Sequence, residues 1–115
     1  MTDHPARAAA AAAAIRELAE ATTDPRNAYA SPAEITAVTG NLRELARQLD
    51  DALRHLEVHI GRRDDGDWAA PDGERPRPNA RQARGAVLSA QAQARNMVRA
   101  LDRALENLGH SKPAP

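Results

Sequence analysis

Apolar residues recur at three- and four-residue spacings along two long stretches of the chain. The first stretch comprises Ile35, Val38, Leu42, Leu45, Leu49, Ala52, Leu53, Leu56 and Ile60. The second comprises Ala83, Val87, Ala90, Ala94, Met97, Val98, Leu101, Ala104, Leu105 and Leu108. Because this spacing follows the 3.6-residue turn of an α-helix, it predicts two amphipathic helices, at residues 32–60 and 80–108.

Local signals mark the ends of both predicted helices. Ser31 can accept from free backbone N–H groups, Pro32 suits the first helical position, and Glu34 can complete a capping box. Asn79 and Gln82 supply the corresponding signals for the later helix, and Gly61 and Gly109 are helix-ending residues. Each helix would span roughly 44 Å at 1.5 Å per residue, so the two can align as an antiparallel hairpin with near-heptad packing.

The remaining segments complete an all-α, single-domain prediction for residues 1–115. An alanine-rich helix is expected at about residues 5–21, with Ile15 and Leu18 as its large apolar side chains. Whether it packs on the hairpin or on a partner is left open. The tail at residues 111–115 is expected to be disordered.

The apolar content of this chain is mostly alanine, which limits the core. There are 27 alanines against 17 Leu, Ile and Val residues. Alanine buries little area, so a monomer of this length would be marginally stable. We therefore expect a homodimer, with a four-helix bundle as its form, or packing on another helical protein. The predicted dimer seam consists of Leu42, Leu45, Leu49, Leu56, Val98, Leu101 and Leu105.

The most pronounced charge pattern is an arginine ridge on the last helix. At 100° per residue its members fall on the side opposite the apolar stripe; they are Arg81, Arg84, Arg95, Arg99 and Arg103. Such a ridge can neutralise phosphates, which makes nucleic acid a candidate partner. An ordinary solvated face, or a face that pairs with acidic residues, is the alternative. The zero net charge of the chain favours the alternative over an obligate nucleic-acid binder.

The connector at residues 61–78 exceeds the usual length of about 12 to 15 residues for a structureless loop. It holds the only tryptophan of the chain, Trp68, among prolines, glycines and charges. One interpretation is a flexible connector with the ring folded back on the end of the hairpin. The other is that Trp68 anchors the loop on a partner.

Catalytic and metal-binding signatures are weak. Asp51, His55 and His59 share one side of a helix at four-residue spacings, which makes them a weak metal candidate, and helix-surface histidines are the preferred interpretation. The chain has no cysteine and lacks a Gly-rich phosphate loop or paired carboxylates suited to acid–base work. We thus expect no catalytic residues, cofactor, small-molecule substrate or membrane association, and a cytoplasmic location. The predicted function is a non-enzymatic helical interaction module, an adaptor or regulator that self-associates; the alternative is an accessory nucleic-acid-binding protein.

Overall fold

The computed structural model describes residues 3–63 and 80–110, and these two ranges contain helices but no strand. The helices are α1 (His4–Ala21), α2 (Pro32–Gly61) and α3 (Ala80–His110). This confirms the all-helical prediction, and each helix lies within two residues of its expected bounds. The chain divides into two compact units, Met1–Ile35 and Thr36–Pro115. No helix in the described ranges has an apolar stretch long enough to cross a membrane.

In the first unit, α1 forms because alanine has the highest helix propensity and because both of its ends are capped. The Asp3 carboxylate accepts a hydrogen bond from the Ala6 N–H at 3.2 Å. At the other end, the Thr22 hydroxyl donates to the Leu18 carbonyl at 2.8 Å. None of the α1 residues is buried, so propensity and caps, rather than a packed face, account for this helix.

A short segment ordered by side-chain bonds joins α1 to α2. The Arg26 N–H donates to Oδ1 of Asp24 at 2.9 Å, and this bond is the main reason that the pKa of Asp24 lies below its ordinary value. At the start of α2, the Glu34 N–H donates to the Ser31 hydroxyl at 3.2 Å. The Glu34 carboxylate accepts from the N–H of Ala30 at 3.4 Å, one residue before the position that a capping box uses.

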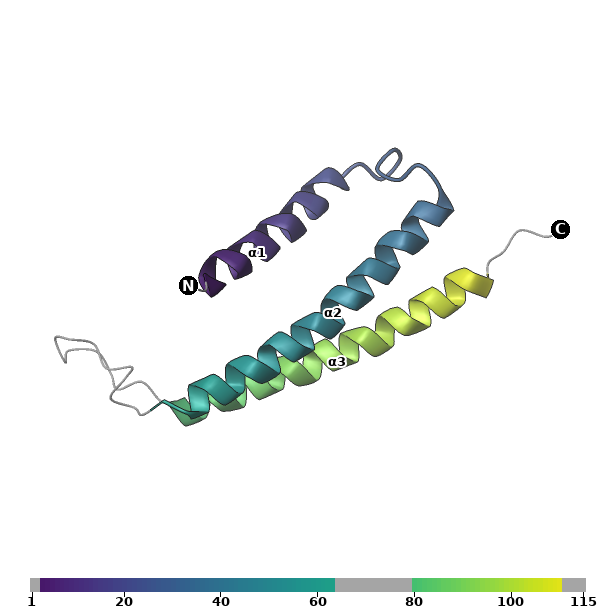
Figure 1. Cartoon of the computed structure of the whole chain (residues 1–115). Coiled ribbons are helices and arrows are strands. Elements are labelled where there is room, and N and C mark those ends of the chain that lie inside the picture. Colours follow the sequence, from purple (N-terminus) through teal and green to yellow (C-terminus); the bar gives the residue numbers. More distant parts are fainter. Residues whose placement is uncertain (1–2, 64–79, 111–115) are drawn as a thin grey trace. The chain divides into compact units, whose positions relative to one another are not determined.

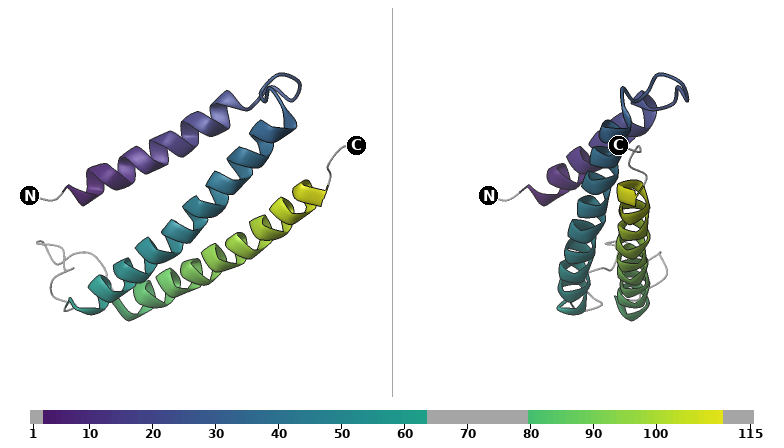
Figure 2. Two further views of the ribbon diagram at one scale, coloured as in Figure 1. Left: turned by 45° about the vertical axis from the view of Figure 1, so that its right-hand side comes forward. Right: turned by 90° about the vertical axis from the view of Figure 1, so that its right-hand side faces the viewer.

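In the second unit, α2 and α3 pack side by side and run antiparallel (Figures 1 and 2). The buried positions of the pair are two alanines and two polar residues: Ala46 at 0%, Ala94 at 3%, Gln91 at 5% and Glu57 at 8% exposed. No large side chain in the described residues is fully buried. The small alanines allow close approach of the helices, but they contribute little hydrophobic free energy.

The face of α2 that contacts α3 differs from the one expected. The apolar stripe predicted contact at Leu45, Leu49 and Leu56, all of which are exposed. The more buried positions follow one residue later in each case, at Ala46, Asp50 and Glu57. One residue is a rotation of about 100°, so Leu45, Leu49 and Leu56 turn away from the contact, whereas Leu53 and Ile60 of the same stripe are half-buried beside Ala46 and Glu57. This rotation brings Asp50 and Glu57 within reach of Arg95 and Arg84 of α3.

Candidate interaction surfaces

Three ion pairs join α2 to α3 along one side of the hairpin. They are Arg43–Asp102 at 2.7 Å, Asp50–Arg95 at 3.3 Å, and Glu57–Arg84. Their partners are 59, 45 and 27 residues apart in sequence, so each pair forms only when the hairpin does. The pairs form only with α2 turned so that Asp50 and Glu57 lie toward the arginines of α3.

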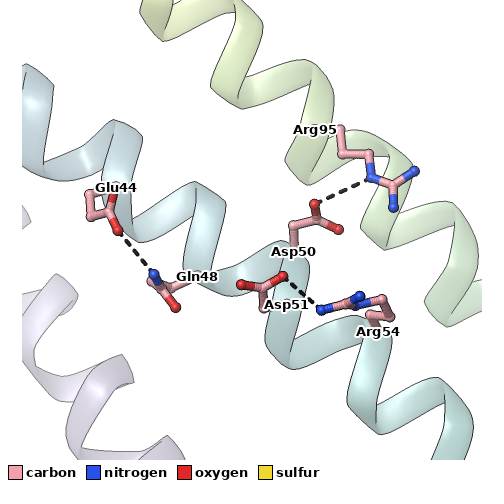
Figure 3. Close-up of polar contacts among 6 residues, drawn as sticks. All are labelled: Glu44, Gln48, Asp50, Asp51, Arg54 and Arg95. Atoms are coloured by element: carbon pink, nitrogen blue, oxygen red, sulfur yellow. Dashed lines mark hydrogen bonds and ion pairs between the residues drawn. The ribbon is translucent and has the colours of Figure 1, made fainter.

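Asp50 interacts with three side chains, those of Gln91, Arg95 and Arg54. Its carboxylate accepts from Nε of Arg95, and Figure 3 shows the side chain extending across to α3. Its pKa lies below the ordinary value of 3.8, chiefly because the Gln91 side chain hydrogen-bonds to it. Partial desolvation acts in the opposite direction, and Arg95 and Arg54 lower the pKa further. The folded state therefore stabilises the charged form of this carboxylate.

Glu57 lies in the last two turns of α2, where Arg84 of α3 binds its carboxylate. Nε of Arg84 donates to Oε1 of Glu57 at 2.8 Å, and the same guanidinium lies against Gly61, the last residue of α2. A β-carbon at position 61 would lie only 2.8 Å from Nε of Arg84. Glycine thus leaves the space that the guanidinium occupies, and the positive charge also faces the negative end of the α2 macrodipole.

The charges of the hairpin are confined to the side that carries the ion pairs. At 100° per residue, all Asp, Glu and Arg residues from Thr36 to Gly61 and from Ala80 to His110 project to that half of the helix pair. We call this the charged half; its members are Arg43, Glu44, Arg47, Asp50, Asp51, Arg54, Glu57, Arg81, Arg84, Arg95, Arg99, Asp102, Arg103 and Glu106. Figure 3 shows one intrahelical ion pair within it, Asp51–Arg54 at 3.2 Å.

The opposite side of the hairpin, from Thr36 to Gly61 and from Ala80 to His110, has no Asp, Glu, Lys or Arg, and we call it the uncharged face. Its members are Val38, Leu42, Leu45, Leu49, Ala52, Leu56 and Ile60 of α2 and Ala83, Ala86, Ala90, Gln93, Met97, Leu101, Ala104 and Leu108 of α3. Large side chains on it remain well exposed, at 41% for Leu49, 48% for Leu56 and 47% for Met97. A continuous apolar surface of this kind is typical of a binding site.

The predicted dimer seam is divided between two places in the structure. Leu45, Leu49 and Leu56 lie exposed on the uncharged face, and Leu42 is half-buried at its edge. Val98 and Leu105 are half-buried and continue the heptad spacing of the buried residues of α3, toward α2, and Leu101 is half-buried at the edge of the uncharged face. Met97 and Leu108, which the sequence placed among the general apolar positions, join the exposed leucines instead.

The arginine ridge of α3 lies within the charged half. Two of its members, Arg84 and Arg95, pair with acids of α2. Arg99 donates to the Asn96 side chain at 3.1 Å. Among the described residues, no ion pair of Arg81 or Arg103 is present. The ridge is thus partly neutralised by α2, as the acidic-pairing interpretation predicts.

The other predicted candidates give no assembled site. Asp51 pairs with Arg54, and the described ranges contain no group of three His, Cys, Asp or Glu side chains placed to hold a metal ion, so His55 and His59 do not combine with Asp51 into one. Trp68, most of the 61–78 connector, the Asn79 cap and the 111–115 tail lie outside the described residues. Comparisons with protein-family models, curated proteins and solved structures gave no match.

Proposed function

We propose that the chain is a non-enzymatic helical interaction module that self-associates through the uncharged face of the α2–α3 hairpin. The observation that carries the proposal is the rotation of α2. Because Asp50 and Glu57 take positions against α3, Leu45, Leu49 and Leu56 are left on the surface. A hairpin with Ala46 and Ala94 as its buried apolar residues gains little from its own core, and covering the leucines supplies the missing hydrophobic free energy.

The size of the uncharged face supports a stable dimer. The overlapping parts of α2 and α3 are roughly 40 Å long at 1.5 Å per residue, and two helices packed 8 to 10 Å apart are about 20 Å wide. The face therefore offers about 800 Å², which is the area that each partner of a typical specific complex buries.

A second copy is favoured as the occupant because a two-fold contact uses the same patch on both copies. A charge within such a patch would lose its water against the uncharged patch of the other copy, with no opposite charge to pair with. The uncharged face avoids this cost from Thr36 to Gly61 and along α3, whereas the charged half of the same hairpin would bury several charges. Two hairpins packed through this face form a four-helix bundle.

Leu56 and Leu88 provide a matched test of this proposal. They are 48% and 49% exposed, and both lie between the Glu57–Arg84 and Asp50–Arg95 pairs. Leu56 is on the uncharged face, whereas Leu88 is on the charged half. Leu56→Gln should weaken the dimer about thirtyfold, since half the burial of one leucine, counted twice by symmetry, is about 2 kcal/mol. Leu88→Gln should leave the dissociation constant unchanged.

Sedimentation equilibrium of the wild type and both variants at micromolar concentration gives the outcome. Two chains per particle, with dissociation selective for Leu56→Gln, supports the proposal. A mass of one chain for the wild type would overturn it, whether the face is then covered by α1 or left in water. Equal weakening by both substitutions would also overturn it, because the contact would then not be specific to the uncharged face.

A further inference from the structure

The uncharged face changes in bulk along its length. At the end far from the 61–78 connector the face carries Leu42 and Leu45 of α2 with Leu101 and Leu108 of α3, and Leu49 and Met97 lie near its middle. At the connector end α2 carries Leu56 and Ile60, but the α3 side consists of Ala83, Ala86, Ala90 and Gln93. The α3 side thus gives the face a bulky end and a small end, and helix spacing depends on the side chains at the contact.

Two arrangements of two copies are compatible with a two-fold axis. In one, the connectors lie at the same end, and α2 of each copy packs on α3 of the other. In that case the bulky ends meet each other, and the helices are held apart at one end and close together at the other. In the second arrangement the connectors lie at opposite ends, and α3 packs antiparallel on α3 of the other copy.

From this gradient we propose that the two copies pack with their connectors at opposite ends, so that the bulky end of each fills the small end of the other. This inference rests on the proposed self-association and specifies the partner surface. In this arrangement Met97 and Leu101 lie over the alanines and Gln93 of the second copy. The interaxial distance is then uniform along the whole interface, and both ends are packed without voids.

The positions of Ala86 and Ala104 on α3 distinguish the two arrangements of the dimer. They are 104 − 86 = 18 residues apart, which is five full helical turns, so they project from the same line of α3 about 27 Å apart. Residue 95 is midway between them and is also the midpoint of Ala80–His110. A two-fold axis at the middle of α3 therefore sets Ala86 of one copy against Ala104 of the other.

The chain has no cysteine, so each substitution supplies a unique thiol on the full-length protein. Chains carrying Ala86→Cys and Ala104→Cys are mixed, oxidised and analysed for disulfides. We expect the mixed 86–104 disulfide in preference to either homodisulfide. Ala92→Cys, an exposed alanine on the other side of α3, is the matched control and should form no disulfide with the Ala104→Cys chain.

Spin labels at the same cysteines give a second measurement that does not depend on oxidation. Pulsed dipolar spectroscopy should give about 30 Å between labels at position 86 in a dimer, and about the same at position 104. If the connectors share an end, the two α3 helices lie diagonally across the four-helix bundle. Both distances should then be about 15 Å, because neighbouring helices are 8 to 10 Å apart. Short distances at both positions would overturn the inference while leaving self-association standing. A one-chain mass in the sedimentation experiment would overturn both.

Discussion

Gly61 lies beneath the guanidinium of Arg84, so close that a β-carbon there would come within 2.8 Å of Nε. The same guanidinium donates to Glu57, whose side chain is 11% exposed. A residue at the end of α2 is therefore coupled to the contact between α2 and α3.

We expect Gly61→Ala to give no stabilisation, although alanine is normally the better helix former. The new methyl group displaces Arg84, and the carboxylate of Glu57 loses a charge-assisted bond. Gly85→Ala is the control, since nothing lies within 4 Å of a β-carbon at that position. It should raise the free energy of unfolding by about 0.5 to 1 kcal/mol. Urea denaturation of both variants gives the comparison.

Repeating Gly61→Ala in an Arg84→Ala background shows whether its effect on stability comes from the displacement of the Arg84 side chain. Once the guanidinium is gone, Gly61→Ala should become stabilising like Gly85→Ala. Equal stabilisation by Gly61→Ala in both backgrounds would show that the close approach of Arg84 has no energetic consequence.

Leu49→Asp tests whether the uncharged face is covered in solution. Leu49 is 41% exposed in the single chain, so a carboxylate there is tolerated by a monomer. In the dimer it would be buried without a partner, at a cost of several kcal/mol. The wild-type melting temperature should rise with protein concentration, as for any fold stabilised by association, and Leu49→Asp should abolish this dependence.

Val58→Asp is the matched substitution, because Val58 is also 41% exposed but projects from the charged half. It should retain the concentration dependence of the wild type. If the melting temperature of the wild type does not change between about 1 and 100 μM, no association contributes to its stability at these concentrations.

The helices of this chain were predictable because their signals are local. Periodic apolar residues, the Ser31 cap and the alanine run each act within a few residues, and the three helices lie where these signals place them. The rotation of α2 was not predictable in the same way. It depends on Asp50 and Glu57 meeting arginines that are 45 and 27 residues away in sequence. An apolar stripe shows which face avoids water, but not what covers that face.

A signal for the rotation was nevertheless present in the sequence. Asp50 and Glu57 are seven residues apart, and Arg84, Gln91 and Val98 recur at the same interval. Two acids seven residues apart on one helix, and an arginine, a glutamine and a valine at the same interval on the next, indicate an interhelical contact. Weighing this pattern against the leucine stripe would have separated the hairpin contact from the exposed face.

The environment of Asp50 predicts a pH dependence with a definite sign. Its folded pKa lies below 3.8, mainly because of Gln91 and then Arg95, so its contribution to stability is present above this pH. That contribution is lost as the pH falls through the folded pKa. Asp50→Asn should therefore be less stable than the wild type at pH 7, and the difference should shrink between about pH 4 and pH 2. Thermal unfolding across this range measures it; a difference that grows on acidification would contradict the assignment.

The charged half predicts weak or absent DNA binding. It carries eight arginines and six carboxylates, a net charge of 8 − 6 = +2. Two of the five ridge arginines, Arg84 and Arg95, already pair with acids of α2. A labelled duplex should therefore show no change in fluorescence polarisation at near-physiological salt. Any binding at low salt should have a log–log salt slope no steeper than about −3, as three phosphate contacts would give.

A slope steeper than about −4 would mean that Arg84 and Arg95 leave their acids to contact phosphate, and the arginine ridge would then be a nucleic-acid site. Arg99→Gln and Arg47→Gln would test that outcome, because Arg99 is on the ridge, whereas Arg47 is on α2 at 4.0 Å from Glu44. A ridge that binds DNA requires a loss of affinity for Arg99→Gln alone. Equal losses for both variants would indicate attraction to net charge without a defined site, since nonspecific binding depends on the total positive charge near the duplex.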